Sequence, residues 1–279
     1  MLILIRGLAF YLLKSILFPD RLRTKILFLF GKSNAIYRCR INKTKFLYCS
    51  PKNDALNKHA RTDFINWENL SRSVWRELSK SAVDIVDAGS YTGIYAIEAA
   101  KANSRAKVYA YEPTPSSFFI LSLNVYLNKL DNIYPERIAL GDTEKTSVFF
   151  TFNEFPDLNS FDKINKVKVN EIKVAVRPLD ALHQTIDLIK ADVEGSELDL
   201  LIGCKKLLEK CNPTILIEFH GALGGSKIST LLQDYGYTKY VLLDSIKSNY
   251  LIWHDRNDEL VQLTLNKTSP EFIDRIINF

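Results

Sequence analysis

The sequence lacks the features of several protein classes. Its 279 residues include four cysteines and no C-x-x-C pair, so we expect no disulfide framework. No low-complexity tract or internal repeat is present, which argues against a disordered chain or a repeat array. We interpret the four cysteines as reduced thiols of a cytoplasmic protein: Cys39, Cys49, Cys204 and Cys211.

Long apolar runs are also missing. The first 18 residues, MLILIRGLAFYLLKSILF, are strongly apolar, but Arg6 and Lys14 interrupt them. The longest uncharged stretch, residues 7–13, is too short to span a bilayer. No small-x-small cleavage site follows, so we do not expect a signal peptide.

Positive charge is concentrated at the N-terminus. The net charge is +5, yet residues 1–50 hold ten basic residues and only Asp20 as an acid. The other 229 residues hold 27 basic and 31 acidic side chains, which is a balance of −4. Because a nucleic-acid enzyme would spread basic residues around its site, we expect no nucleic-acid partner.

We predict that residues 1–50 are a basic, apolar, helical segment. Residues 1–25 either make a peripheral contact with the cytoplasmic face of a membrane or pack on protein. In the second case the surface covered is the body of the chain or a sister subunit of an oligomer.

From residue 83 onward, strand patterns alternate with helix patterns. Expected strands are 83–87, 107–112, 132–140, 146–152, 171–179, 187–193, 213–219, 237–243 and 249–255. Expected helices are 93–102, 116–129, 197–210 and 227–236. This order predicts an α/β domain over residues 81–255, with a mostly parallel sheet and helices on both faces. A helical lead-in at 51–80 and a tail helix at 256–279 flank it.

Acidic residues stand at the ends of four predicted strands. Because ligands of such sheets bind outside the carboxyl ends of the strands, these residues belong to one candidate rim. The rim residues are Asp87, Glu112, Asp192 with Glu194, and Glu218 with His220.

The first strand-to-helix turn reads DAGSYTG, residues 87–93. A dinucleotide fingerprint would require glycine at position 91, but Tyr91 stands there and would obstruct a pyrophosphate. A nucleoside with a smaller zwitterionic tail fits better, with its ammonium near Asp87. Gly89 and Gly93 could alternatively serve only to close a tight turn.

Glu112 ends the second strand, 19 residues after Gly93. A carboxylate at this place can accept two hydrogen bonds from a ribose diol. The alternative is a salt-bridged glutamate at a strand end.

Several motifs resemble those of the FkbM family of S-adenosylmethionine-dependent methyltransferases. They are VDIVDAGSYTG, YAYEPTPSSF, SLNVYLN, IALGD, RPLD and IKADVEGSELDLLIGC…NPTILIEFHG, in the family's order, over about residues 80–220. DVEGSE after a strand is the most specific of them. Where the family usually has alanine and asparagine in the first loop, this chain has Ser90 and Tyr91.

The resemblance implies a class I methyltransferase fold, with a seven-stranded sheet whose last strand is antiparallel, and S-adenosyl-L-methionine as cofactor. It places the first loop at the methionine moiety, Glu112 at the ribose, residues 139–142 near the adenine and Asp192 between cofactor and acceptor. The cofactor-binding set expected is Asp87, Ala88, Gly89, Ser90, Tyr91, Gly93, Glu112, Pro113, Leu140, Asp142 and Asp192.

The resemblance also implies O-methylation, often of a sugar, a glycolipid or another glycosylated acceptor. Because a sugar hydroxyl is a poor nucleophile, a base that takes its proton would help. His220 is the first candidate, although it could be a loop histidine with a structural role. The other candidates are Asp192, Glu194 and Glu218, and Asp192 with Glu194 could instead ligate a divalent ion.

Two further readings stay open at this point. The polar stretch 153–170 is either a flap over the acceptor site or a solvated hairpin tip. The competing functions are a nicotinamide-dependent oxidoreductase and a non-catalytic nucleoside-binding scaffold.

Overall fold

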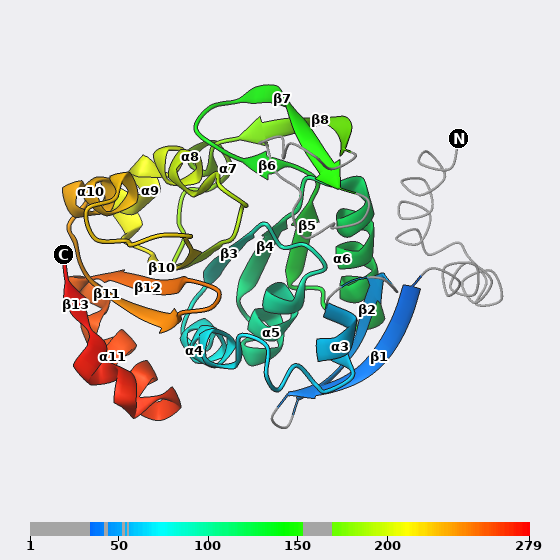
Figure 1. The fold of residues 1–279 in the computed structure, drawn as a ribbon, viewed down its shortest axis with the longest axis horizontal. Coiled ribbons are helices and arrows are strands. Elements are labelled where there is room, and N and C mark those ends of the chain that lie inside the picture. Colours follow the sequence, from blue (N-terminus) through cyan, green and yellow to red (C-terminus); the bar gives the residue numbers. More distant parts are fainter. Residues whose placement is uncertain (1–33, 42–43, 52–53, 55, 153–168) are drawn as a thin grey trace.

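The structure is a computed structural model that describes residues 34–41, 44–51, 54, 56–152 and 169–279. Its centre is a sheet of eight strands in the order β13-β11-β12-β10-β9-β3-β4-β5 (Figure 1). The strands are β3 (Asp84–Ala88), β4 (Lys107–Tyr111), β5 (Ile133–Glu136), β9 (Leu188–Ala191), β10 (Thr214–Glu218), β11 (Tyr237–Asp244), β12 (Asn249–His254) and β13 (Ile277–Asn278).

Five neighbouring strands of this sheet are parallel, and β12 runs antiparallel to β10. This is the α/β arrangement with an antiparallel late strand that the sequence predicted. The expected number of strands was seven. The eighth is β13, two residues long, which pairs with Lys239 and Tyr240 at the edge of β11.

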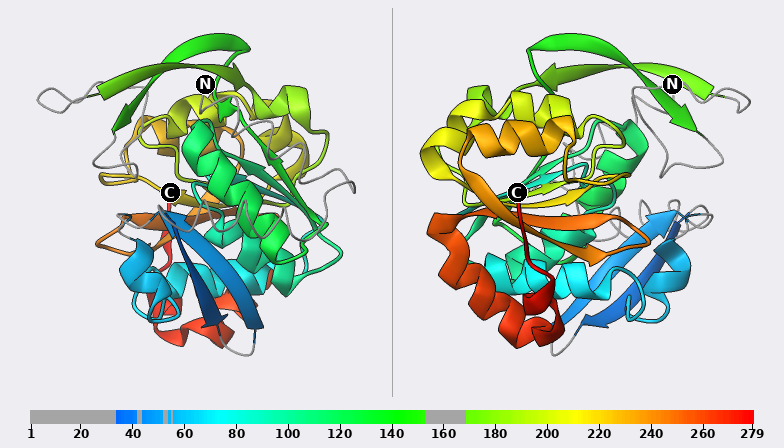
Figure 2. Two further views of the ribbon diagram at one scale, coloured as in Figure 1. Left: turned by 90° about the vertical axis from the view of Figure 1, so that its right-hand side faces the viewer. Right: turned by 60° about the vertical axis from the view of Figure 1, so that its left-hand side comes forward.

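Helices cover both faces of the sheet, as Figure 2 shows. Because successive side chains of a strand point to opposite faces, Ile85 packs into one core and Val86 into the other. The first core includes residues of α4 (Asn69–Ser79), α5 (Ile94–Ala102) and α11 (Asp258–Thr268). The second includes residues of α8 (Glu197–Ile202), α9 (Lys205–Cys211) and α10 (Lys227–Asp234).

A smaller sheet of order β6-β8-β7 adjoins these layers. It consists of β6 (Ala139–Leu140), β7 (Lys145–Phe152) and β8 (Val169–Arg177), and the short helix α7 (Leu179–Leu182) follows it. The flap predicted within 153–170 falls almost wholly on residues 153–168, which lie outside the described part of the chain.

The helix predicted over 197–210 is two helices, because the chain turns at Gly203. A side chain at this position would collide with the backbone oxygen of Gly141 after β6. The close approach of these two backbones therefore requires glycine and separates α8 from α9.

Residues 34–50 form a hairpin and not the helix expected for residues 1–50. β1 (Asn34–Ile41) and β2 (Thr44–Pro51) pair antiparallel. Cys39 and Ile41 on one strand and Phe46 and Tyr48 on the other are buried at every second position, which is the period of a strand. Residues 1–33 of the same predicted segment lie outside the described residues.

The hairpin is held by asparagine side chains of α6 (Pro115–Leu127) and the residue after it. The Asn124 side chain accepts from Cys49 N at 2.6 Å and donates to Cys49 O at 2.9 Å. Asn128 does the same for Leu47, at 2.9 and 2.6 Å. These bonds satisfy backbone groups of β2 that no further strand pairs with. The helix α3 (Leu56–Ala60) follows the hairpin and contacts both of its strands.

Candidate active site

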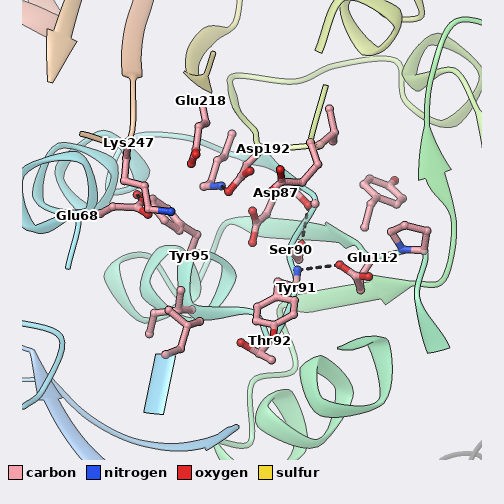
Figure 3. A pocket seen from close by; sticks show the side chains of 18 of the residues that line it. Glu68, Asp87, Ser90, Tyr91, Thr92, Tyr95, Glu112, Asp192, Glu218 and Lys247 are labelled. Atoms are coloured by element: carbon pink, nitrogen blue, oxygen red, sulfur yellow. Dashed lines mark hydrogen bonds and ion pairs between the residues drawn. The ribbon is translucent and has the colours of Figure 1, made fainter. Parts of the chain in front are cut away.

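A cavity of about 310 Å³ opens at the carboxyl ends of β3, β4, β9 and β10. On one side β3 pairs with β4, the next strand in the chain, and on the other side it pairs with β9. The cavity therefore lies at the point where the strand order reverses. Figure 3 shows its polar side chains. They come from the strand ends, from the turn after β3 and the first turn of α5, from the segment 54–68 and from the turn between β11 and β12.

Asp87, near the end of β3, is 1% exposed and presents one unsatisfied oxygen. Its Oδ2 accepts from Ala96 N in α5 at 3.0 Å, whereas Oδ1 is buried without a hydrogen-bond partner among the described residues. Burial raises the pKa of Asp87 to about 6, although Lys190 counters this rise. A buried acceptor of this kind fits a positively charged donor group from a ligand, such as an ammonium.

The two glycines of the first turn are favoured by their backbone conformation, and Gly89 is also required by packing. Both have positive φ, +73° at Gly89 and +88° at Gly93. A side chain at Gly89 would collide with the backbone oxygen of Asp192, and one at Gly93 would collide with Leu121 of α6. Gly89 lines the cavity and Gly93 does not. Closing the turn therefore accounts for Gly93. Gly89 closes the turn and also lines the cavity.

Tyr91 occupies the left-handed region with φ of +48°, which is uncommon for a bulky residue. Its backbone N–H donates to Glu112 Oε2 at 3.0 Å, and its hydroxyl donates to Asp54 Oδ2 at 2.9 Å. Asparagine, the usual residue of the family at this position, adopts this backbone conformation more readily. The two hydrogen bonds thus hold Tyr91 in a conformation that its own side chain disfavours.

Glu112 follows β4 and is 6% exposed. Its Oε1 accepts from the backbone N–H of Thr114 at 2.8 Å and from the Thr114 hydroxyl, and its Oε2 accepts from Tyr91. Burial raises the pKa of Glu112 to about 7 against the effect of these hydrogen bonds. Of roughly four acceptor positions on a carboxylate, about one is left. The predicted pair of hydrogen bonds to a ribose diol would need this position and one more.

Asp192 and Glu218 stand side by side at the other end of the cavity (Figure 3). Asp192 Oδ2 lies 2.8 Å from Lys190 Nζ in an ion pair. Glu218 is 8% exposed, and burial together with the Asp192 charge raises its pKa to about 8. One carboxyl group is thus paired with a cation, while its neighbour holds a proton more readily.

The remaining predicted residues divide into two sets. Ser90, Pro113, Leu140 and Glu194 line the cavity. Ala88 is buried in β3, and Asp142 is ion-paired with Lys145 at 2.7 Å; neither is among the lining residues. His220 is also outside the lining: its side chain is 70% exposed, with Nε2 3.5 Å from Glu218 Oε1. In the described part of the chain, no group of three or more His, Cys, Asp or Glu is arranged to hold a metal ion.

Sequence comparison agrees with this geometry. The family model described as the methyltransferase FkbM domain matches residues 87–239, more than half of the chain. The chain belongs to the FkbM methyltransferase family. The resemblance over about residues 80–220 is therefore confirmed, and the protein is a methyltransferase that depends on S-adenosylmethionine. This decides against the oxidoreductase and scaffold readings.

Two curated methyltransferases are similar to this FkbM methyltransferase. Methyltransferase 1 of Beauveria bassiana (strain ARSEF 2860) is 24% identical over 177 residues, covering 55% of this chain and 71% of that protein. Methyltransferase sdnD of Sordaria araneosa is 27% identical over 188 residues, covering 55% of this chain and 73% of that protein. The crystal structure of methyltransferase FkbM from Methylobacillus flagellatus KT gives a TM-score of 0.47 at 18% identity, over 62% of this chain and 44% of that chain.

Sequence reasoning missed much of the cavity of this FkbM methyltransferase. The missed lining residues with polar or aromatic side chains include Asp54, Lys58, His59, Trp67, Glu68, Tyr95, Lys190 and Lys247. Only Lys190 gave a usable signal, as a charged residue inside the apolar strand LIKA. The others lie on loops and helices that carry no motif.

Proposed function

We propose that this enzyme transfers a methyl group from S-adenosylmethionine to a hydroxyl of a sugar, a glycolipid or another small glycosylated acceptor. One observation carries this proposal: the end of the cavity around Asp192 and Glu218 combines carboxyl groups with the aromatic rings of Trp67 and Tyr95. Carboxyl groups accept hydrogen bonds from hydroxyls, and aromatic faces suit the apolar faces of a sugar ring.

On the cofactor side, the orphaned Asp87 Oδ1 would receive the ammonium of the methionine moiety. Glu112 would meet the ribose, and Pro113 with Leu140 would form an apolar wall beside the adenine. The cofactor supplies an electrophilic methyl group on its sulfonium. What these side chains contribute is the fixed orientation of that group toward the acceptor, which is the main demand of an in-line transfer.

On the acceptor side, Asp192 is our candidate for the group that takes the hydroxyl proton. It lines the cavity, and its ion pair with Lys190 holds its carboxyl group in a fixed position there. Glu218 would donate or accept a second hydrogen bond to the acceptor. His220 and Glu194 become second choices, His220 because its side chain is 70% exposed and outside the lining.

Acceptor identity would be set by segments on either side of the family-matched range 87–239. Trp67 and Glu68 precede this range and Lys247 follows it, yet all three line the cavity. This end combines the carboxyl groups of Glu68, Asp192, Glu194 and Glu218 with the ammonium groups of Lys190 and Lys247. Such a mixture of hydrogen-bond acceptors and donors suits the hydroxyls of a glycan.

We further propose that the enzyme works in the cytoplasm, with residues 1–25 contacting the membrane face or a sister subunit. The charge of +9 over residues 1–50 supports attraction to anionic lipid. Among the described residues, no helix combines the length and the apolar composition that crossing a membrane requires.

Transfer of a radiolabelled methyl group tests the proposed reaction. The full chain is incubated with S-adenosylmethionine labelled at the methyl group and with separate glycan, lipid and RNA fractions of cells. We expect label in the glycan or glycolipid fraction that survives mild alkali, as an ether does. Label in RNA, or label lost with mild alkali as from an ester, would contradict the proposal.

A further inference from the structure

Lys190 is a charged residue in the middle of the central sheet. All four residues of β9 are buried, and Lys190 is 3% exposed. In the sheet register it stands beside Asp87 of β3 and Leu216 of β10. An ammonium at such depth is costly unless carboxylates surround it, so its surroundings decide why it is there.

The Lys190 side chain connects two walls of the cavity. Its Nζ lies 2.8 Å from Asp192 Oδ2 and 4.6 Å from the centre of the Tyr95 ring in α5. The Tyr95 hydroxyl donates to Glu68 Oε2 at 2.6 Å on the loop before α4. A chain of contacts thus runs from the end of β9 through Lys190 and Tyr95 to Glu68.

Ionisable groups from seven places in the fold face this ammonium or each other across the cavity. They are Asp87 on β3, Tyr95 on α5, Glu68 before α4, Glu112 after β4, Asp192 after β9, Glu218 on β10 and Lys247 in the β11–β12 turn. Burial alone would lower the pKa of Lys190, but Asp192, Asp87 and Glu68 raise it above its ordinary value. Lys190 therefore stays charged throughout the neutral range.

The same interaction acts on the carboxyl groups. Burial raises the pKa of Asp87 to about 6, and Lys190 is the strongest influence that opposes this rise. Lys190 also opposes the rise at Glu218 and Glu68. Without the ammonium, burial would act with less opposition, and Asp87 would take up a proton nearer to neutral pH.

We propose that Lys190 is a positioning residue: its ammonium fixes Asp192 through a direct ion pair and stands beside Asp87 in the sheet register, so that it holds both carboxyl groups as hydrogen-bond acceptors at the cavity. This inference rests on the proposed function, in which Asp87 meets the ammonium of the cofactor and Asp192 meets the proton of the acceptor hydroxyl. Lys190 needs no contact of its own with either ligand.

A purely structural ion pair would behave differently. Its removal would lower the free energy of unfolding, because a buried carboxylate would lose its partner. The cofactor affinity of the folded protein, and the pH at which that affinity is lost, would stay as they were. The pH dependence of binding therefore separates the two roles.

The test compares Lys190→Met with Lys190→Arg in the full chain, using S-adenosylhomocysteine as probe. Calorimetric titration between about pH 5.5 and 8.5 gives Kd and the pH at which binding is half lost. Lys239→Met is the matched control, because Lys239 pairs with Asp258 at 2.7 Å on the same sheet but outside the cavity lining. Thermal unfolding of each variant reports its stability.

We expect wild-type binding to weaken as the pH falls toward about 6, where Asp87 gains its proton. In Lys190→Met this midpoint should rise by about one pH unit, and Kd at about pH 5.5, the lower end of the titration, should increase roughly eightfold. Lys190→Arg should restore Kd to within about threefold, and Lys239→Met should leave both quantities unchanged. Lys190→Gln takes the place of the methionine variant if that variant does not fold.

Wild-type Kd and midpoint in a folded Lys190→Met or Lys190→Gln protein would overturn the inference. So would an equal shift of the midpoint in Lys239→Met. A wild-type protein that binds no S-adenosylhomocysteine at any pH would contradict the proposed cofactor site itself. Failure of the cofactor site is thus distinguishable from failure of this inference, in which the wild type and the Lys190 variants bind S-adenosylhomocysteine equally well.

Discussion

The two halves of the cavity differ in how the chain builds them. The half that we assign to the cofactor comes from the ends of β3 and β4, two consecutive strands, and lies inside the family-matched range 87–239. The half that we assign to the acceptor adds the segment 54–68 and Lys247 to the ends of β9 and β10. Local motifs therefore describe the first half, whereas the second depends on packing between segments far apart in sequence.

The largest effect is expected at the backbone contact between the two halves. In Gly89→Ala the new methyl group would meet the backbone oxygen of Asp192, which cannot move without breaking the β3–β9 pairing. We expect the free energy of unfolding to fall by about 3–5 kcal/mol, or the protein not to fold. Chemical denaturation measures this change.

Gly93→Ala is the matched comparison within the same turn. Its new methyl group would meet the flexible end of the Leu121 side chain, which can shift, so a loss of about 1–2 kcal/mol is expected. An equal loss in both variants would show that left-handed strain, and not the Asp192 contact, sets the requirement for glycine.

Two substitutions, one in each half of the cavity, test whether the halves bind different ligands. Glu112→Ala removes the acceptor of three hydrogen bonds at the first loop, so binding of S-adenosylhomocysteine should weaken at least about tenfold. Trp67→Leu should leave that affinity within about threefold and raise the acceptor KM by about tenfold. Calorimetry measures the cofactor affinity and steady-state kinetics measure the acceptor KM. Equal losses of cofactor affinity in the two variants would show that the two halves do not bind separate ligands.

Much of the fold could be predicted from the sequence because its signals are local. β-Branched runs such as VDIVD alternate with helical periods, and this order alone implies a parallel sheet. The acidic strand ends Asp87, Glu112, Asp192 and Glu218 could be assigned to one rim because carboxyl ends of parallel strands share an edge. The structure places all four at the cavity.

The rest could not be predicted because it depends on tertiary contacts. The residues against which Gly89 and Gly203 pack, Asp192 and Gly141, are remote in sequence. The hairpin of residues 34–51 was expected to be helical, since its apolar composition masked an alternation that only burial makes visible. His220 follows the predicted strand, but its side chain is exposed and lies outside the cavity lining, and its role as a base stays a prediction.

The buried carboxyl groups should make the free energy of unfolding depend on pH. Burial raises the pKa of Asp87 to about 6, of Glu112 to about 7 and of Glu218 to about 8. Between about pH 4.5 and 8 the folded state therefore holds protons that the unfolded state has released. The free energy of unfolding of the ligand-free protein should fall as the pH rises through this window.

Glu218→Gln tests this sign, because the amide stays uncharged. We expect the variant to be more stable than wild type at pH 8, by on the order of 2 kcal/mol, and to differ little from it at pH 5. Glu259→Gln, at an exposed position of α11, is the control. Denaturation at both pH values measures the difference, and wild-type stability of Glu218→Gln at pH 8 would contradict the prediction.

The smallest effect is expected at His220, the residue that the sequence favoured most as a base. Its imidazole is largely exposed, lies 3.5 Å from Glu218 and is not among the lining residues, so its loss removes no wall of the cavity. His220→Ala should keep S-adenosylhomocysteine affinity and turnover within about twofold, whereas Asp192→Asn should lower turnover at least about a hundredfold. Single-turnover rates measured with saturating cofactor compare the two. If the histidine variant loses more turnover than the asparagine variant, the base belongs to the exposed end of β10, and the acceptor half of the cavity must extend to that surface.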